Sequence, residues 1–590
     1  MKQFFKFFFA SVFGTLTALL LAVIGFFIFV SIMVSVVSSE ETVSLSEKTV
    51  FELQLDYNIA ERTSYERSNA FSLLLPGLVK QPGLKEIVDN IKKAKVDEDI
   101  TGIYLNLNNF IAGSYVNVRT IREAVKDFKL SGKFVIAYGN RISQKAYYLA
   151  SAADKIYLAP TGSLDARGLS MELTFFKKTL DMLEIEPQIF QAGKYKSAVE
   201  TFDHEKMSAA NSEQLNAYLN SIYDEIVNQI AHDRKLNTID LKNIFDEFKT
   251  NNIHDALNLG VIDGLKYYDQ LVDTLKILSG VKQDESLKKV KLETYMNVPT
   301  ANLTSSPNRI AVIYAVGEIL EGNGNEDYIG LENITKELRK ARKNKNVKAI
   351  VLRINSPGGS PLTSEQILRE VQLTKGVKPI IVSFSGVAAS GGYYIACAAD
   401  EIVSDPFCIT GSIGAFGILP NLNKFFDKKL GVTFDRVQTG KYGGLYSMVA
   451  PLSADEKKII QSQIDGIYND FTARVADGRS MSLDYVREIA QGRIYSGLQA
   501  IEIGLIDSIG GLQEAIDIAA DRAEIKDYRI VEYPAVKEPF DKIMDLFTTE
   551  IFSPFSDFGS LKAEDIIRNV KNFISEKGLL TRMPFDVTIN

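Results

Sequence analysis

The sequence repeats itself, and this internal duplication limits the possible folds more than any other feature. Residues 134–170 and 380–416 share a Tyr-Tyr pair followed at the same spacing by Ala-Ala-Asp. Other matches keep the same order along both halves: IYLNLNNFIAGS with IVLRINSPGGS, QAGKY with QTGKY, and HDALNLGVIDGL with LQAIEIGLIDSIGGL. Ordered matches of this kind indicate two copies of one structural unit.

Each copy has the pattern of an α/β unit. Short apolar runs such as AIVLRI and PIIVSFS alternate with charged helical stretches, which predicts parallel strands covered by helices. A chain of 590 residues also exceeds what one hydrophobic core usually organises. We expect an N-terminal repeat over residues 46–290, a linker over 291–308, a C-terminal repeat over 309–540 and a tail over 541–590 that matches nothing in the first half.

The N-terminus carries a long uncharged run. Lys2 and Lys6 precede residues 7–38, and Glu40 and Glu41 follow them. A helix needs about 20 apolar residues to cross a bilayer, and a secretory signal has an apolar run of only roughly 7–15. With the positive-inside rule, this predicts a cytoplasmic segment over 1–6, a single-pass uncleaved anchor over 7–38, and the remaining chain on the periplasmic side of a bacterial inner membrane. A cleaved signal peptide is the alternative.

Composition excludes several kinds of chemistry. A net charge of −7 without a basic block predicts no nucleic-acid partner. The two cysteines, Cys397 and Cys408, fit small buried residues better than a disulfide framework, and no Cys/His spacing suggests a metal, so we expect no cofactor. All three histidines lie in the first half, so a Ser-His-Asp triad in the second half would have to borrow one.

Two glycine-rich segments follow consecutive predicted strands of the second copy. NSPGGS (355–360) ends the first strand, and GVAASGGYY (386–394) places Ser390 at a strand-to-helix corner with Gly391 behind it. A helix N-terminus offers free amides and a positive dipole end, which suit a developing oxyanion. Taken alone, Ser390 fits a helix N-cap equally well.

The duplication identifies a candidate base. Lys196, in GKYKSAVETF, falls where the second copy has Gly443, and Ser390 falls where the first copy has Gln144. A buried lysine can be neutral near pH 7 and can activate a serine. Each copy therefore keeps one half of a dyad, whereas Lys196 considered alone would be interpreted as a solvated surface residue.

The motifs ASGGYY, TGSIG, NSPGGS and YKSAVE together resemble the long form of the signal peptide peptidase SppA family, also called protease IV, over residues 45–540. That family is similar in fold to the Clp protease and crotonase group, so the resemblance implies tandem spiral β-β-α domains. It also implies these roles: Ser390 as nucleophile, Lys196 as general base, Ser412 as the residue that orients the lysine, and Gly359 and Gly391, with Gly358 as a further candidate, as oxyanion donors.

The resemblance further implies a homotetramer on the membrane that degrades cleaved signal peptides and other short apolar peptides.

Two other functions fit parts of the pattern. A crotonase-type acyl-CoA enzyme would use a glycine-rich oxyanion hole but needs no serine nucleophile and no export anchor. A catalytically inactive membrane scaffold would show damage at the active positions. The damage is instead complementary between the copies, and the first copy has IAGS (111–114) where the second has PGGS.

Overall fold

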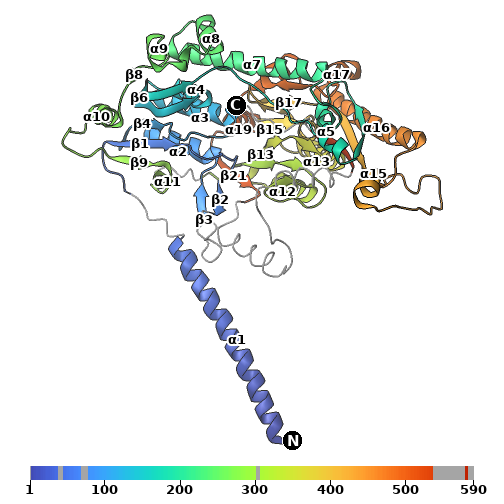
Figure 1. Ribbon diagram of the computed structural model, residues 1–590. Helices are drawn as coiled ribbons and strands as arrows, with labels where there is room; N and C mark the ends of the chain where they lie inside the picture. Colours follow the sequence, from blue (N-terminus) through green and yellow to red (C-terminus); the bar gives the residue numbers. More distant parts are fainter. Residues whose placement is uncertain (1, 38–43, 68–77, 300–305, 536–577, 583–590) are drawn as a thin grey trace.

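Two α/β units pack against each other, and one long helix projects away from them (Figure 1). The computed structural model describes residues 2–37, 44–67, 78–299, 306–535 and 578–582. Helix α1 (Lys2–Val37) contains a stretch, Gln3–Ala22, with a mean hydropathy of 1.8 and no buried residue. At 1.5 Å per residue α1 is about 54 Å long, which exceeds the ~30 Å hydrocarbon core of a bilayer. The helix begins at Lys2, before the predicted start of the anchor at residue 7.

The first repeat is built on a parallel sheet of order β8-β6-β5-β4-β1-β9. Its strands are β1 (Thr49–Gln54), β4 (Ile100–Asn106), β5 (Phe134–Ser143), β6 (Lys155–Asp165), β8 (Gly264–Leu265) and β9 (Lys289–Lys291). A separate antiparallel hairpin joins β2 (Ser64–Arg67) and β3 (Leu78–Gln81). The helices are α2 (Leu84–Val96), α3 (Tyr115–Lys129), α4 (Gln144–Ala150), α5 (Lys177–Met182), α6 (Glu200–Asp203), α7 (Ala209–Arg234), α8 (Thr238–Asp246), α9 (Ile253–Asn258), α10 (Tyr268–Ser279) and α11 (Leu292–Tyr295).

The second repeat has the same strand path, β20-β16-β15-β13-β10-β21, and every pair in it is parallel. Its strands are β10 (Arg309–Val316), β13 (Val347–Ser356), β15 (Ile380–Ala389), β16 (Glu401–Ser404), β17 (Ile409–Gly411), β19 (Ile494–Ser496), β20 (Ser508–Ile509) and β21 (Arg529–Tyr533). Its helices are α12 (Leu331–Lys343), α13 (Pro361–Lys375), α14 (Gly391–Tyr394), α15 (Asn423–Phe425), α16 (Ala454–Arg479), α17 (Leu483–Ile489), α18 (Gly497–Glu502) and α19 (Leu512–Arg522). The shared path confirms the duplication.

Repeated motif residues have the same structural tasks in both copies. Asp154 and Asp400 each accept a hydrogen bond from the backbone amide near the start of a central strand, β5 and β15 respectively. Tyr147 and Tyr393 are fully buried, and each donates its hydroxyl to a backbone carbonyl later in its own repeat. These residues recur because they connect the elements of the core.

The boundary between the repeats differs from the predicted linker over 291–308. Strand β9 pairs with β1, and α11 packs its Tyr295 ring 5.0 Å from the ring of Phe51, so the start of that segment belongs to the first repeat. Residues 300–305 lie outside the described part of the chain.

A third sheet joins the two repeats. Its order is β12 (Tyr328–Ile329), β11 (Glu318–Ile319), β14 (Gly358–Gly359), β22 (Gly578–Arg582), β18 (Ala415–Asn421) and β7 (Glu186–Ala192). Strand β7 of the first repeat runs antiparallel to β18 of the second, with Ala192 opposite Ala415. The core of the first repeat also includes side chains from the second: Ala389, Phe407, Ile409 and Ile494. The repeats are therefore held in one fixed arrangement.

A buried ion pair lies between the repeats. Arg353 on β13 donates to Glu61 of the first repeat at 2.9 Å, and it also donates to Ser383 and to the carbonyl of Phe384. Both charged side chains are at most 5% exposed. Removing one partner of such a pair leaves an uncompensated buried charge, whereas replacing both by apolar residues is often tolerated.

We expect Glu61→Leu to lower the free energy of unfolding by about 3–5 kcal/mol, because Arg353 keeps its charge without its carboxylate. The double variant Glu61→Leu/Arg353→Met should recover most of that loss. Urea unfolding followed by fluorescence measures both. A loss below about 1 kcal/mol in Glu61→Leu, or a double variant less stable than the single one, would contradict this role of the pair.

Candidate active site

Ser390 occupies a strained corner between β15 and α14. Its backbone has φ +56° and ψ −118°, a conformation that residues with a Cβ rarely adopt. Its amide donates to the carbonyl of Gly411 at 2.8 Å, and the residue is fully buried. The surrounding fold therefore holds the hydroxyl in one place at the start of a helix.

Lys196 reaches Ser390 from the other repeat. It follows β7 by four residues, and its Nζ lies 2.8 Å from Ser390 Oγ. The same Nζ lies 2.8 Å from the carbonyl oxygen and 3.0 Å from Oγ of Ser412. The structure thus brings together all three side chains that the sequence grouped, and it does so within a single chain.

The surroundings of Lys196 favour its neutral form. The residue is 1% exposed, and burial alone lowers its pKa well below the ordinary 10.5. Within the described residues, no carboxylate pairs with this amine. A neutral amine has two N–H groups and one lone pair. The two acceptors on Ser412 can take the N–H groups, which leaves the lone pair to accept the proton of the Ser390 hydroxyl.

Ser412 is fixed as firmly as Ser390. Its backbone also has a positive φ, +52°, and its amide donates to the carbonyl of Arg493 at 2.7 Å. It lies between β17 and β18, so the strand that pairs with β7 begins three residues after it. Strand β7, which precedes Lys196, and strand β18, which follows Ser412, therefore pair with each other.

The glycine pair of β14 lies directly against the corner that holds Ser390. A Cβ added at Gly391 would lie 3.1 Å from the amide nitrogen of Gly359, and one added at Gly359 would lie 1.9 Å from the carbonyl oxygen of Ile319. The φ of Gly359 is +147°, so neither the space nor the backbone admits a side chain there. The amide nitrogen of Gly359 therefore lies close to Gly391, the residue that follows Ser390.

Gly358 has a different task. Its amide donates to Ser356 Oγ at 3.2 Å, so this N–H is already engaged. Gly358 has φ +102° and forms the turn that precedes Gly359.

Several residues that position Lys196 were not identified from the sequence. Gly492, with φ +73°, packs so closely that an added Cβ would lie 2.6 Å from the Cβ of Lys196. Gln214 on α7 donates to the carbonyl of Tyr195 at 3.0 Å and to Ser197 Oγ, and Asn211 accepts from that same hydroxyl. For Asn211 and Gln214, the signal that could have revealed them is a pair of polar residues on the buried face of a helix.

The first copy has lost the corresponding chemistry. Gln144 stands at the position of Ser390, and its side-chain oxygen accepts hydrogen bonds from the amides of Arg167 and Gly168, both at 2.8 Å. The first-copy residue at the position of Ser390 therefore holds a neighbouring loop in place. Ala112 and Gly113 keep the positive φ of the glycine pair, so the first copy retains this turn although it has no serine at the position of Ser390.

The two cysteines are free and fully buried. Burial raises the pKa of the Cys397 thiol to about 12 and raises that of Cys408 as well, so neither is a reactive thiolate near neutral pH. This agrees with their expected role as small core residues.

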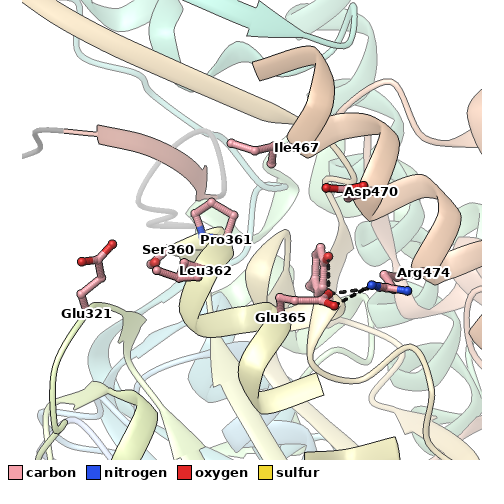
Figure 2. Close-up of a pocket in the computed structure, with 9 residues that line it drawn as sticks. Glu321, Ser360, Pro361, Leu362, Glu365, Ile467, Asp470 and Arg474 are labelled. Atoms are coloured by element: carbon pink, nitrogen blue, oxygen red, sulfur yellow. Dashed lines mark hydrogen bonds and ion pairs between the residues drawn. The ribbon is translucent and has the colours of Figure 1, made fainter. Parts of the chain in front are cut away.

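A cavity of about 500 Å³ opens next to the glycine pair and α14, the helix that follows Ser390 (Figure 2). Its wall includes Ser360, directly after Gly359, and Tyr394 at the end of α14. An ion pair of 2.7 Å between Glu365 and Arg474 joins α13 to α16 across this cavity. The remaining lining residues are Glu321, Pro361, Leu362, Ile467 and Asp470.

Comparisons with known proteins agree with this geometry. The profile of peptidase family S49 matches residues 127–282 and 372–526, one match in each repeat, and the Clp protease profile matches residues 311–404. The chain is 33% identical to Protease 4 of Salmonella typhi, over 80% of this chain and 77% of that one. It is 37% identical to Protease 4 of Haemophilus influenzae, over 74% and 72% of the two chains.

A plant relative is equally extensive: the chloroplastic serine protease SPPA of Arabidopsis thaliana is 32% identical over 79% of this chain and 69% of its own. The predicted fold class, tandem α/β domains of the Clp protease type preceded by an apolar helix, is thereby confirmed. With a family match in each repeat and relatives that span most of both chains, this protein belongs to peptidase family S49 and is a serine peptidase.

Proposed function

We propose that Ser390 is the nucleophile and Lys196 the general base of a membrane-anchored endopeptidase. The observation that carries this proposal is the 2.8 Å contact between Lys196 Nζ and Ser390 Oγ in a fully buried setting, where no carboxylate of the described residues pairs with the amine. A lysine that is kept neutral by burial can take the hydroxyl proton as the oxygen attacks.

The chemistry follows from the positions of the donors. Ser390 Oγ attacks the peptide carbonyl carbon while Lys196 Nζ takes its proton, and the carbonyl oxygen becomes an oxyanion. The amides of Gly359 and Gly391 stabilise that charge. The lysine ammonium then protonates the leaving amine, and an acyl-serine remains. Water, deprotonated by the neutral Lys196, hydrolyses this ester and releases the second product.

The substrates we propose are cleaved signal peptides and other short apolar peptides. The support is the family resemblance together with the N-terminal helix, which would keep the site close to a bilayer in which such peptides remain after secretion. The lysines before the apolar stretch favour a cytoplasmic N-terminus, so the catalytic repeats would lie on the periplasmic side of a bacterial inner membrane.

We also propose that the chain assembles with copies of itself, as a homotetramer by family resemblance. The dyad is complete within one chain, so assembly is not needed to build it. Support comes from the segment between α15 and α16, where large apolar side chains are exposed: Leu430, Phe434, Val437 and Tyr446. A second copy could cover such a surface.

The two rival functions explain less. An acyl-CoA enzyme gives no role to a neutral lysine at hydrogen-bonding distance from a serine. An inactive scaffold has no reason to keep the strained φ of Ser390 and Ser412. The first copy has Gln144 at the position of Ser390, and the second has Gly443 at the position of Lys196. A single active site shared by both copies requires this complementary loss.

We expect Ser390→Ala and Lys196→Met each to lower kcat by on the order of 10⁴-fold or more, and the double variant to be no worse, because the two groups act as a unit. Ser412→Ala should cost only about tenfold, since its backbone carbonyl still holds Nζ. Hydrolysis of a quenched fluorogenic peptide measures all four. Wild-type turnover in Lys196→Met would rule out the dyad.

Activity should rise with pH along one alkaline limb. Burial lowers the pKa of Lys196, so kcat/KM should increase through that lowered pKa and level off below pH 10.5. Between the lowered pKa and 10.5 the unfolded chain binds more protons than the folded one, so stability should also rise with pH in that window. A pH series of kcat/KM, with urea unfolding of Lys196→Met as the comparison for stability, checks both. If the residual activity of Lys196→Met still rose along the same alkaline limb, the assignment of that limb to Lys196 would be contradicted.

Gly492→Ala should lower kcat by roughly 10²-fold with KM little changed, because the new Cβ and the positive φ displace Lys196 from Ser390. Gly466→Ala is the matched control: it lies within α16 and its Cβ meets nothing within 4 Å. Steady-state kinetics of the two variants separate the effects. Equal activities in both would remove Gly492 from the positioning of the base.

A further inference from the structure

Helix α12 and the start of β13 carry an excess of positive charge. Residues 331–348 contain seven basic and two acidic side chains, although the whole chain has a net charge of −7. Arg339 and Arg342 are neutralised by ion pairs with Glu370. Four other side chains, the lysine patch, are exposed and form no ion pair with any residue that the structure describes: Lys336, Lys343, Lys345 and Lys348. The first repeat shows whether the fold itself needs this charge.

The same position in the first repeat is occupied by residues 84–101, which form α2 and the start of β4. Helices α2 and α12 both have 13 residues. They also end alike: the amides of Asp97 and Asn344 each donate to the carbonyl four residues back, both at 3.1 Å. Lys133 and Lys378 each donate to two carbonyls at the end of the helix. The two stretches are therefore structurally equivalent.

The two equivalent stretches nevertheless differ in charge. Residues 84–101 contain four basic and five acidic side chains. When the two helices are aligned over their full length, the lysine patch stands where the first repeat has Asp89, Val96, Glu98 and Thr101. The first repeat folds with these residues, so the fold does not require positive charge at the four positions. Folding therefore does not account for the lysine patch, whereas attraction of a negatively charged partner does.

The position of α12 indicates which partner is within reach. In Figure 1, α12 lies at the edge of the body nearer to α1, and α8 and α9 lie at the opposite edge. Helix α1 ends at Val37 and β1 begins at Thr49, so the connection between them extends about 40 Å at most. A membrane-spanning α1 thus keeps the body close to a bilayer, and this tether raises the effective concentration of lipid headgroups at the patch.

We propose that the lysine patch docks on the phosphate groups of anionic phospholipids in the membrane that α1 anchors. This inference rests on the proposed membrane anchor and is independent of the catalytic dyad. Lysines near a negatively charged bilayer surface are attracted to it over about one Debye length. The patch gives the body a second attachment besides α1, and it determines which face of the two repeats is turned toward the bilayer.

The test measures how close α12 lies to the lipid headgroups. Full-length protein is placed in nanodiscs of phosphatidylcholine alone or of phosphatidylcholine mixed with anionic phosphatidylglycerol. Val377→Cys carries a donor dye, and the headgroups carry the acceptor. Val377 is exposed and precedes Lys378, which contacts the end of α12. The two native cysteines are fully buried, so the added thiol is labelled selectively.

Two triple variants remove the same charge from opposite edges of the body. The patch variant is Lys336→Gln/Lys343→Gln/Lys345→Gln. The control variant changes lysines on and around α8, at the edge far from α1: Lys235→Gln/Lys242→Gln/Lys249→Gln. Both should keep the peptide turnover of the wild-type protein in detergent, which shows that they are folded.

Energy transfer in the wild-type and control proteins should be about twofold higher in the anionic nanodiscs than in the neutral ones, because the lysine patch is drawn to the charged headgroups. This difference should disappear at about 1 M salt, where the Debye length is about 3 Å. The patch variant should show most of this loss already at low salt.

Equal energy transfer in the two lipids for the wild-type protein, or an equal loss in the patch and control variants, would overturn the docking on lipid while the anchor stands. If labelled polyglutamate then binds the wild-type protein but not the patch variant in detergent, the patch recognises an acidic polypeptide instead. If the protein is not retained in either kind of nanodisc, the proposed anchor itself fails, and the lipid docking fails with it.

Discussion

The antiparallel pairing of β7 with β18 is the contact on which the active site depends. It joins the repeat that carries Lys196 to the repeat that carries Ser390, and its register places the lysine loop beside Ser412. The shared core and the buried Arg353–Glu61 pair hold the same arrangement from the other side. Lys196 and Ser390, one from each repeat, therefore stay in contact, because the repeats cannot move apart without breaking a sheet and a core.

Burial of Lys196 lowers the pKa of its amine, which the proposed mechanism requires. An exposed lysine would remain an ammonium ion and could not take a proton from serine. At 1% exposure, with hydroxyls and a carbonyl as its polar neighbours, Lys196 is favoured as a neutral amine. The strained backbones of Ser390 and Ser412 and the close approach of Gly492 fix the amine within hydrogen-bonding distance. The fold thus supplies both the altered pKa and the position that a base requires.

The sequence was informative where the duplication constrained it. Comparing the copies predicted one shared fold and paired Ser390 with Lys196, because these residues stand where the other copy has Gln144 and Gly443. Ser412 was implied only by the resemblance to the SppA family. The sequence could not show the β7–β18 pairing, because the residues of one strand do not specify which distant strand it pairs with. It also missed β22: its two partners on β14 are glycines without side chains, so no hydrophobic pattern marks the contact. Gln214 and Asn211 were missed because their partners are backbone and hydroxyl groups of a loop.

The protonation state of Lys196 is the central claim, and it can be observed directly. Lysine labelled with ¹³C at Cε and ¹⁵N at Nζ can be followed by NMR through a pH titration of Ser390→Ala in detergent, with the additional Lys196→Met variant identifying the signal. We expect one lysine resonance, absent from the Lys196→Met protein, to titrate well below 10.5 while the exposed lysines titrate near that value. A Lys196 signal that titrates with the exposed lysines would contradict a neutral base and, with it, the proposed mechanism.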